Sequence, residues 1–166
     1  MAWVFAYGSL MGDALLRRYR ARPARLPGYH RAFTHESRRR WGQPPQGCPV
    51  LGLTSGGDCW GVAFEVPRED QGGVLRALQR REGADERRRE THVVETPEGP
   101  VEAWVWVSAN GRCGPEPDLP TLEARLRAAH GIVGTGTEYV RTLVHSLELH
   151  GLDDPLVDAL WTRLRD

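Results

Sequence analysis

Glu82 is the residue whose type and position in the sequence best suit it for catalysis. It lies near the end of a helix that we expect over residues 68–83. Val74, Leu75 and Leu78 form the apolar stripe of that helix, and Glu82 follows Leu78 at i+4, on the same stripe. A carboxyl group on the core-facing side of a helix is partly removed from water, which suits it for general acid/base chemistry near neutral pH.

A second interpretation of Glu82 is structural. The residue lies in the last turn of the expected helix, where helices fray, and three arginines, Arg80, Arg81 and Arg87, are close to it in the sequence. A surface ion pair with one of them would occupy the carboxylate without giving it a catalytic function. The spacing alone leaves both interpretations open, because an ionisable residue in an unusual setting points to a functional site only statistically.

The segment Tyr7–Leu10, with the sequence YGSL, is the second candidate for chemistry. It follows residues 3–7, WVFAY, which are apolar on both faces and predict a buried strand. Gly8 permits close backbone approach, and successive amides in such a loop can hold an anion. A plain strand-ending turn is the alternative, since Gly and Ser dominate turns. Ser9 is not expected to be a nucleophile, because Gly8–Gly12 lacks the GxSxG pattern of a nucleophile elbow.

The composition argues against several classes of protein. The 166 residues favour one domain, 1–166, and the 22 basic and 22 acidic side chains leave no net charge, which argues against a nucleic-acid binder. Three widely spaced cysteines and six histidines show no ligand spacing, so we expect no metal site and no cofactor. The start of the chain does not resemble a signal peptide, and no run reaches the about 20 apolar residues of a membrane span. We therefore expect a cytoplasmic protein.

Six strands are expected in the first two thirds of the chain. After the strand at residues 3–7 and a helical turn at 14–20, Pro23 and Pro27 predict a linker. A segment rich in proline and glycine at 37–49 predicts a loop. The remaining strands are expected at 28–37, in a hairpin over 50–67 that turns at 55–58, and in a hairpin over 91–108 that turns near 97–99.

Helices dominate the last third of the chain. Besides the helix at 68–83, we expect one over 121–131 with Thr121 as its N-cap, one over 137–151 and one over 153–165, after a loop at 109–120. Strands and helices are thus segregated along the sequence. This segregation indicates an α+β fold, in which helices flank a sheet or a small barrel.

Six stretches of sequence form an ordered pattern. They are VFAYGSLM at the start, GYHRAF at 28–33, WGVAFEV at 60–66, LQRREG at 78–83, and EYV at 138–140 followed by GLDDP at 151–155. In this order they resemble the ChaC-like γ-glutamylcyclotransferases, over nearly the whole chain. YGSL alone is moderately specific, whereas YGSL with a downstream Arg-Glu at a helix end is a strong signature.

The resemblance implies both a fold and a reaction. The fold is a small mixed β-barrel with surrounding helices. The reaction cleaves a γ-glutamyl amide, typically glutathione, into 5-oxoproline and a free amine, which is Cys-Gly for glutathione. By match to the family pattern, Glu82 is the catalytic carboxylate. The residues that match the substrate pocket are Tyr7, Gly8, Ser9, Leu10 and Tyr139.

The implied chemistry agrees with the residues that the sequence offers. The substrate's own α-amine attacks its γ-carbonyl, so the enzyme needs no protein nucleophile and no metal. It has to hold the two groups together, which supplies much of the rate. One carboxylate can remove the ammonium proton and return a proton to the leaving amine, while amides of the YGSL loop hold the substrate carboxylate or the oxyanion.

Three segments depart from the family pattern. Ser37–Gly42 reads SRRRWG where members usually have an acidic-His-Arg-Gly string, and Gly83–Asp85 replaces a frequent Gly-Gly-Tyr. Gly131–Gly136 has no Asn where a Gly-Pro-Ser-Gly-x-Asn pattern is typical. We expect these loops to shape the side of the pocket that receives the leaving group. The resemblance therefore supports the reaction type better than it supports glutathione as the substrate.

A non-catalytic binding module on the same scaffold is the alternative function. Such a protein would use the Tyr7–Leu10 loop to hold a γ-glutamyl or other amino-acid-like ligand without turnover. Glu82 argues for the enzyme, because a binder has no chemical need for an acid there. The arginine runs 38–40 and 87–89 are expected to be solvated rather than to bind phosphate or nucleic acid.

Overall fold

The computed structural model describes residues 1–83, 87–108 and 115–166. The residues of the expected loop at 109–114, and Ala84 and Asp85 of the segment that departs from the family pattern, lie outside this description. The elements, in chain order, are β1 (Ala2–Ala6), the short 3-10 helix η1 (Ser9–Gly12), β2 (Arg20–Ser37), β3 (Cys48–Val66), α1 (Gln71–Gly83), β4 (Arg87–Thr96), β5 (Gly99–Ser108), α2 (Leu119–Ala128), α3 (Gly136–Leu149) and α4 (Pro155–Leu164).

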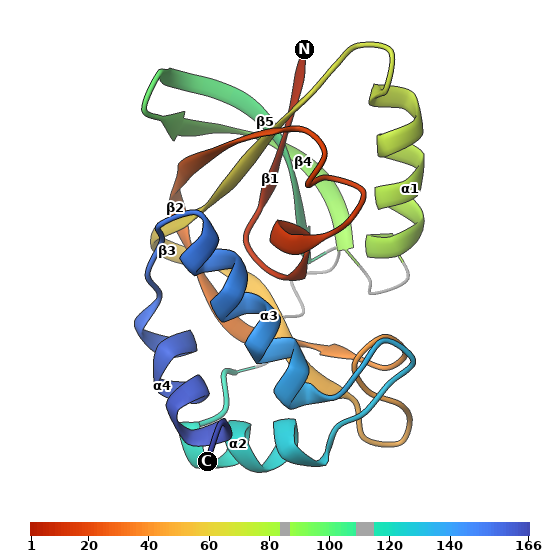
Figure 1. Cartoon of the computed structure of the whole chain (residues 1–166), viewed down its shortest axis with the longest axis vertical. Helices are drawn as coiled ribbons and strands as arrows, with labels where there is room; N and C mark the ends of the chain where they lie inside the picture. The colour runs from red at the N-terminus through yellow and green to blue at the C-terminus, as the bar shows by residue number, and fades with distance from the viewer. Residues whose placement is uncertain (84–86, 109–114) are drawn as a thin grey trace.

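The five strands close into a barrel in the order β1-β3-β2-β4-β5. The pairing of β1 with β5 is parallel and the other pairings are antiparallel, so the barrel is mixed. Apolar side chains such as Phe5, Leu26 and Phe64 are almost completely buried. In Figure 1, α1 lies along one side of the barrel, whereas α2, α3 and α4 pack together in another part of the molecule, where α2 and α3 contact β3. This architecture confirms the expected α+β barrel with flanking helices.

The expected linker around Pro23 and Pro27 is wrong, because both prolines lie inside β2. This strand runs from Arg20 to Ser37 and pairs with β3 in regular register from Arg20↔Glu65 to Pro27↔Asp58. The two prolines are four residues apart, and a strand repeats every two residues. Their missing N–H groups therefore point toward the same neighbour and leave the donors on the other side of β2 intact.

The expected hairpin at 50–67 is also wrong, because Cys48–Val66 is one continuous strand. Tyr29 pairs with Ser55 and Pro27 pairs with Asp58, so two residues of β3 lie opposite one residue of β2. Those two are Gly56 and Gly57, with φ angles of 101° and 69°. They form a β-bulge rather than a chain reversal, and the barrel has five strands where six were expected.

The helices agree with expectation more closely than the strands do. The helix α2 begins earlier than expected, because the Asp118 carboxylate, rather than Thr121, is its N-cap and accepts the Thr121 amide at 2.8 Å. The helix α3 begins with a capping box formed by Thr135 and Glu138. None of the helices in the described part of the chain is long and apolar enough to cross a membrane.

A buried ion pair ties the barrel to the C-terminal helix α4. The Arg31 guanidinium of β2 lies 2.8 Å from the Asp154 carboxylate and also donates to the Trp60 and Tyr7 carbonyls. Asp154 is the N-cap of α4, where its other oxygen accepts the amides of Leu156 and Val157. One buried cluster thus joins β1, β2, β3 and α4, next to the segment that leads into Gly8.

Candidate active site

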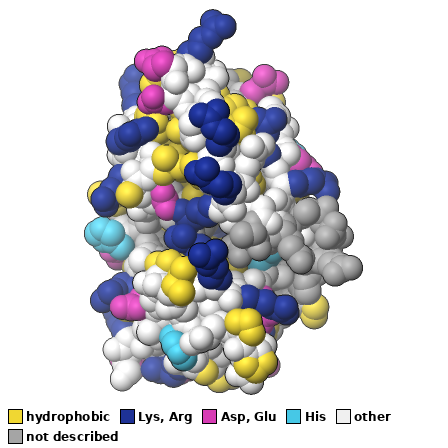
Figure 2. Space-filling view, turned by 90° about the vertical axis from the view of Figure 1, so that its right-hand side faces the viewer, with side chains coloured by type: hydrophobic (Ala, Val, Ile, Leu, Met, Phe, Trp, Pro, Cys, Tyr) yellow, Lys and Arg dark blue, Asp and Glu magenta, His cyan; other side chains and the backbone are white. Residues whose placement is uncertain are grey.

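Four of the six site residues proposed from the sequence line one pocket, where β1, α1, β3 and α3 come together; they are Gly8, Ser9, Glu82 and Tyr139. Its empty volume is about 340 Å³, part of which is open to solvent. The described residues that line it are Gly8, Ser9, Ser37, Arg40, Trp41, Val50, Leu51, Arg81, Glu82, Arg87 and Tyr139. Glu82 is the single carboxylate of this lining, and three of the other residues are arginines. Arginine side chains gather around a hollow in the face shown in Figure 2.

Glu82 is buried at the C-terminal end of α1, with 4% of its surface exposed. Val74 and Leu78 on the same helix are buried with it, as the periodicity predicted. The carboxylate oxygens lie 3.5 Å from the Arg81 Nε and 3.3 Å from an Arg87 nitrogen. Both interpretations of Glu82 are thus partly correct. Glu82 lies on the buried stripe of the helix, and it also pairs with arginines, although not at the surface.

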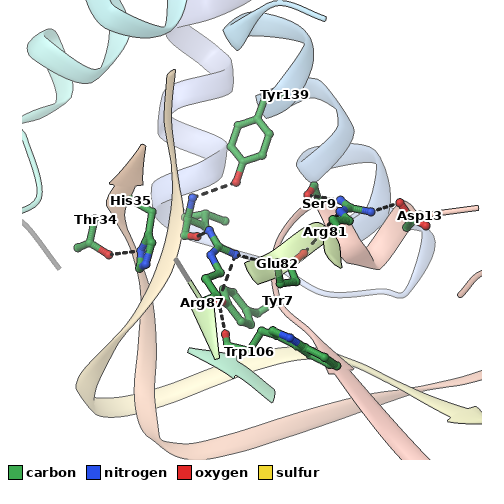
Figure 3. Close-up of polar contacts among 11 residues, drawn as sticks. Tyr7, Ser9, Asp13, Thr34, His35, Arg81, Glu82, Arg87, Trp106 and Tyr139 are labelled. Atoms are coloured by element: carbon green, nitrogen blue, oxygen red, sulfur yellow. Dashed lines mark hydrogen bonds and ion pairs between the residues drawn. The ribbon is translucent and has the colours of Figure 1, made fainter. Parts of the chain in front are cut away.

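Arg81 fixes the YGSL loop to the end of α1. One of its nitrogens donates to the Ser9 Oγ at 2.8 Å, and another pairs with the Asp13 carboxylate (Figure 3). Of the two consecutive residues at the end of α1, Arg81 therefore contacts the loop and Glu82 lies beside the pocket. Because the Ser9 hydroxyl accepts a hydrogen bond from the charged Arg81 side chain, this contact fixes the position of the hydroxyl within the YGSL loop.

Arg87, the first residue of β4, spans the pocket from Glu82 to β3. Its guanidinium donates to the Leu51 carbonyl at 2.7 Å and to the Tyr7 hydroxyl at 3.4 Å, in addition to the contact with Glu82 (Figure 3). Only 12% of the side chain is exposed, so the expectation that the run 87–89 is solvated is wrong for Arg87. The sequence predicted Arg87 as one possible partner of Glu82, but at the surface. It did not predict the burial of Arg87, because that burial follows from closure of the barrel rather than from helical spacing.

The four residues of the YGSL segment divide between the pocket and the core. Gly8 and Ser9 line the pocket. Tyr7 is buried, and its hydroxyl donates to the Trp106 carbonyl at 2.7 Å, while Leu10 is buried in the hydrophobic core. The chain turns here into η1, where the Met11 amide donates to the Gly8 carbonyl at 3.0 Å. Tyr7 and Leu10 therefore anchor the segment in the core, whereas Gly8 and Ser9 face the pocket.

Tyr139 of α3 forms a hydrogen bond with strand β3 at the pocket. Its hydroxyl accepts the Leu51 amide at 2.9 Å, and its ring centre lies 5.4 Å from that of Trp41. Burial raises the pKa of the Tyr139 hydroxyl above its ordinary value, so the group stays neutral at physiological pH. Tyr139 thus borders the pocket as the resemblance implied, and its hydrogen bond fixes the segment of β3 that Arg87 also contacts.

We expect Tyr139→Phe to lower the free energy of unfolding by about 1–3 kcal/mol, because the buried Leu51 amide loses its acceptor. Denaturant titration of both proteins measures the difference. Tyr29→Phe is the control, since Tyr29 is a half-buried tyrosine on β2, and it should leave stability nearly unchanged. Equal stability of Tyr139→Phe and the native protein would show that the hydrogen bond contributes nothing.

His35 on β2 provides a pH-dependent contribution to stability. Burial, and secondarily the positive charge of Arg87, lower the pKa of His35 from 6.5 to about 4. The unfolded chain therefore binds a proton that the folded chain excludes. We therefore expect the free energy of unfolding to decrease as the pH falls from 6.5 through 4, by at most about 3 kcal/mol, because the folded protein keeps His35 neutral.

Unfolding titrations between pH 4 and pH 7 test this expectation. The variant His35→Gln should show a smaller loss of stability across that range than the native protein does. His145→Gln, at an exposed position of α3, should keep the native pH dependence. If His35→Gln and the native protein gave parallel curves, His35 would not be the responsible group.

Two of the segments that depart from the family pattern pack against each other beside the pocket. The Ile132 and Val133 amides donate to the Arg39 and Arg40 carbonyls at 3.0 Å and 2.8 Å. A Cβ atom at Gly131 would lie 2.5 Å from the Arg40 carbonyl oxygen, so this close approach requires glycine. The glycine-rich segment thus supports the loop that carries Arg40 into the pocket lining.

Ser37, Arg40 and Trp41 form one wall of the pocket, which we call the 37–41 wall. The Trp41 amide donates to the buried Ser37 hydroxyl at 3.1 Å, which holds the turn in place. In the sequence this segment was noted for its departure from the family pattern. The arginine run 38–40 did not indicate which of the three arginines faces the pocket. Arg38 and Arg39 are exposed, whereas Arg40 is half-buried.

Fold and site together define a small mixed barrel with one buried carboxylate beside a strand-ending YGSL loop. The model of the ChaC-like protein family matches residues 2–165, and the chain belongs to this family. A glutathione-specific γ-glutamylcyclotransferase of Escherichia coli K12 is 31% identical, over 95% of this chain and 71% of its own length. One of Homo sapiens is 29% identical, over 98% of this chain and 79% of its own length.

The fold has a close counterpart among solved structures. A yeast γ-glutamyl cyclotransferase specific to glutathione superposes with a TM-score of 0.86, at 18% identity, over 99% of this chain and 95% of its own. At this identity the likeness establishes the fold alone. It confirms the mixed barrel with flanking helices.

Proposed function

We propose that this protein is a γ-glutamylcyclotransferase that converts glutathione, or another γ-glutamyl amide, into 5-oxoproline and a free amine. The observation that carries the proposal is the burial of Glu82 in the lining of a pocket that also contains Gly8 and Ser9. The names of the relatives in bacteria and mammals support the same reaction. Glu82 is the proposed catalytic residue.

The mechanism transfers two protons from the attacking nitrogen to the leaving nitrogen. Glu82 takes a proton from the substrate's α-ammonium group, and the freed amine attacks the γ-carbonyl carbon. The same carboxyl group gives this proton to the leaving nitrogen as the C–N bond to the leaving group breaks. The ring nitrogen loses its second proton as the lactam forms, and the released amine takes up a proton to become an ammonium group. The five-membered ring closes within one molecule, so the pocket has to hold the substrate folded, with amine and carbonyl in contact.

The arginines beside Glu82 position the carboxylate for this task. Their contacts with Glu82, at 3.3 Å and 3.5 Å, are longer than the 2.7–2.9 Å that is typical of a strong charged hydrogen bond. A substrate ammonium group can therefore compete for the carboxylate oxygens. Gly8 and Ser9 are proposed to face the γ-glutamyl group, and Tyr7, Leu10 and Tyr139 to hold the surrounding backbone in place.

A product assay tests the proposal. The protein is incubated with glutathione and with a panel of γ-glutamyl amino acids, and 5-oxoproline is measured. Release of 5-oxoproline from at least one compound is the expected result. Stabilisation of the fold by these compounds without product would instead indicate the binding module, and neither effect would contradict both functions. The cytoplasm is the proposed compartment, in agreement with two free buried cysteines, Cys48 and Cys59.

A further inference from the structure

The 37–41 wall contains a buried hydrogen-bond donor without an acceptor. Trp41 is 7% exposed, and its Nε1–H has no hydrogen-bond partner among the described residues. A buried N–H without a partner carries a free-energy penalty that a ligand or a water molecule can remove. Trp41 also lines the pocket, so a ligand acceptor that reached its Nε1–H would remove this penalty.

The neighbouring residue adds a cation to the same wall. Arg40 lines the pocket and is half-buried, and its backbone is held by the Val133 amide. A guanidinium presents several N–H donors in one plane, an arrangement that matches the two oxygens of a carboxylate. Arg40 and Trp41 together therefore provide the donors that a carboxylate requires.

The position of the wall indicates which carboxylate of the substrate it meets. The α-carboxylate of the γ-glutamyl group is bonded to the same carbon as the α-amine, so it stays close to Glu82 during catalysis. Trp41 is instead connected to Glu82 through a series of contacts by way of Arg87, Leu51 and Tyr139. Because Gly8 and Ser9 are proposed to face the γ-glutamyl group, the 37–41 wall is left to a carboxylate in another part of the substrate, which is the leaving group.

We infer that Arg40 and Trp41 bind the terminal carboxylate of the leaving group. This inference rests on the proposed cyclotransferase function and adds specificity to it. The enzyme then selects γ-glutamyl compounds whose leaving amine is an amino acid or short peptide with a free carboxylate, and it discriminates against γ-glutamyl compounds of neutral amines. In this chain the segment Ser37–Gly42, which departs from the family pattern, forms the site that recognises the leaving group.

The test compares glutathione with its C-terminal amide, which has the same scissile bond and lacks the terminal charge. For the native protein we expect kcat/KM to be about 10–100-fold higher for the acid, as for the loss of a hydrogen bond to a charged group. Arg40→Met should reduce that preference by about tenfold or more, mainly through KM for the acid. Trp41→Phe keeps an aromatic ring against Tyr139 and should reduce the preference by about fivefold.

Arg39→Met is the matched control, because Arg39 is an exposed neighbour that lines a separate surface hollow with Ile132. It should leave the ratio of acid to amide unchanged. Equal use of acid and amide by the native protein would overturn the inference, as would an unchanged preference in Arg40→Met. Absence of 5-oxoproline from both substrates and from the panel of γ-glutamyl amino acids would instead contradict the proposed function. The native ratio tests recognition of the terminal carboxylate even if a variant folds poorly.

Discussion

Replacing Glu82 by glutamine is expected to lower kcat for 5-oxoproline formation by about 10²–10⁴-fold, the usual contribution of a general acid/base. Glutamine has nearly the same shape, but Arg81 and Arg87 contact different carboxylate oxygens, so its one amide oxygen keeps only one of the two contacts. It cannot take up the ammonium proton of the substrate. KM should therefore change much less than kcat, because the interaction that is lost belongs to the transition state.

Steady-state kinetics with glutathione measures this effect, and Glu69→Gln is its matched control. Glu69 is exposed just before α1, so this variant makes the same chemical change outside the pocket and should retain full activity. Thermal unfolding of Glu82→Gln shows whether the fold survives the loss of the charge beside two arginines. Native activity in a folded Glu82→Gln protein would remove Glu82 from the mechanism.

Removing the buried cation in Arg31→Met is expected to have the largest effect on stability. The guanidinium is 5% exposed and donates to Asp154 and to the Tyr7 carbonyl, at 2.8 Å and 3.1 Å. Its loss leaves the Asp154 carboxylate buried without its cation, a defect that costs about 3–5 kcal/mol. For a chain of this length the melting temperature should fall by roughly 6–20 °C.

Two further variants separate the buried pair from ordinary surface charge. Arg38→Met breaks an ion pair with Glu36 in which Arg38 is 70% exposed, and it should cost less than about 1 kcal/mol. Asp154→Asn in the Arg31→Met background removes the uncompensated charge while keeping an oxygen for the helix cap. The double variant should therefore be more stable than the sum of the single losses predicts. Strict additivity would mean that the two groups do not interact.

Local patterns were sufficient for the elements whose signals are short-range. The strand at 3–7, the hairpin over 91–108 and the four helices lie within a few residues of their expected positions. Apolar periodicity placed Glu82 on a buried helix face because burial repeats with the turns of a helix. The two wrong expectations about the strands, at 23–27 and 50–67, concern Pro and Gly. These residues mark the end of a strand in one context and an irregularity within it in another.

The pairing partner decided between those two outcomes. Gly56 and Gly57 have positive φ angles, which occur in hairpin turns as well as in bulges. The partner strand β2 continues on both sides of this point, so the chain bulges and goes on. No window of local sequence contains that information, because the partner residues lie almost thirty positions away.

By itself, the sequence determined the class of fold, the family and the residue proposed for proton transfer, because each depends on local periodicity or on an ordered set of short motifs. Only the tertiary structure decided what surrounds that residue. Arg87 comes from the start of β4, and Arg40 and Trp41 come from the loop between β2 and β3. Closure of the barrel brings them to one pocket, and the side that each residue faces follows from packing between distant segments.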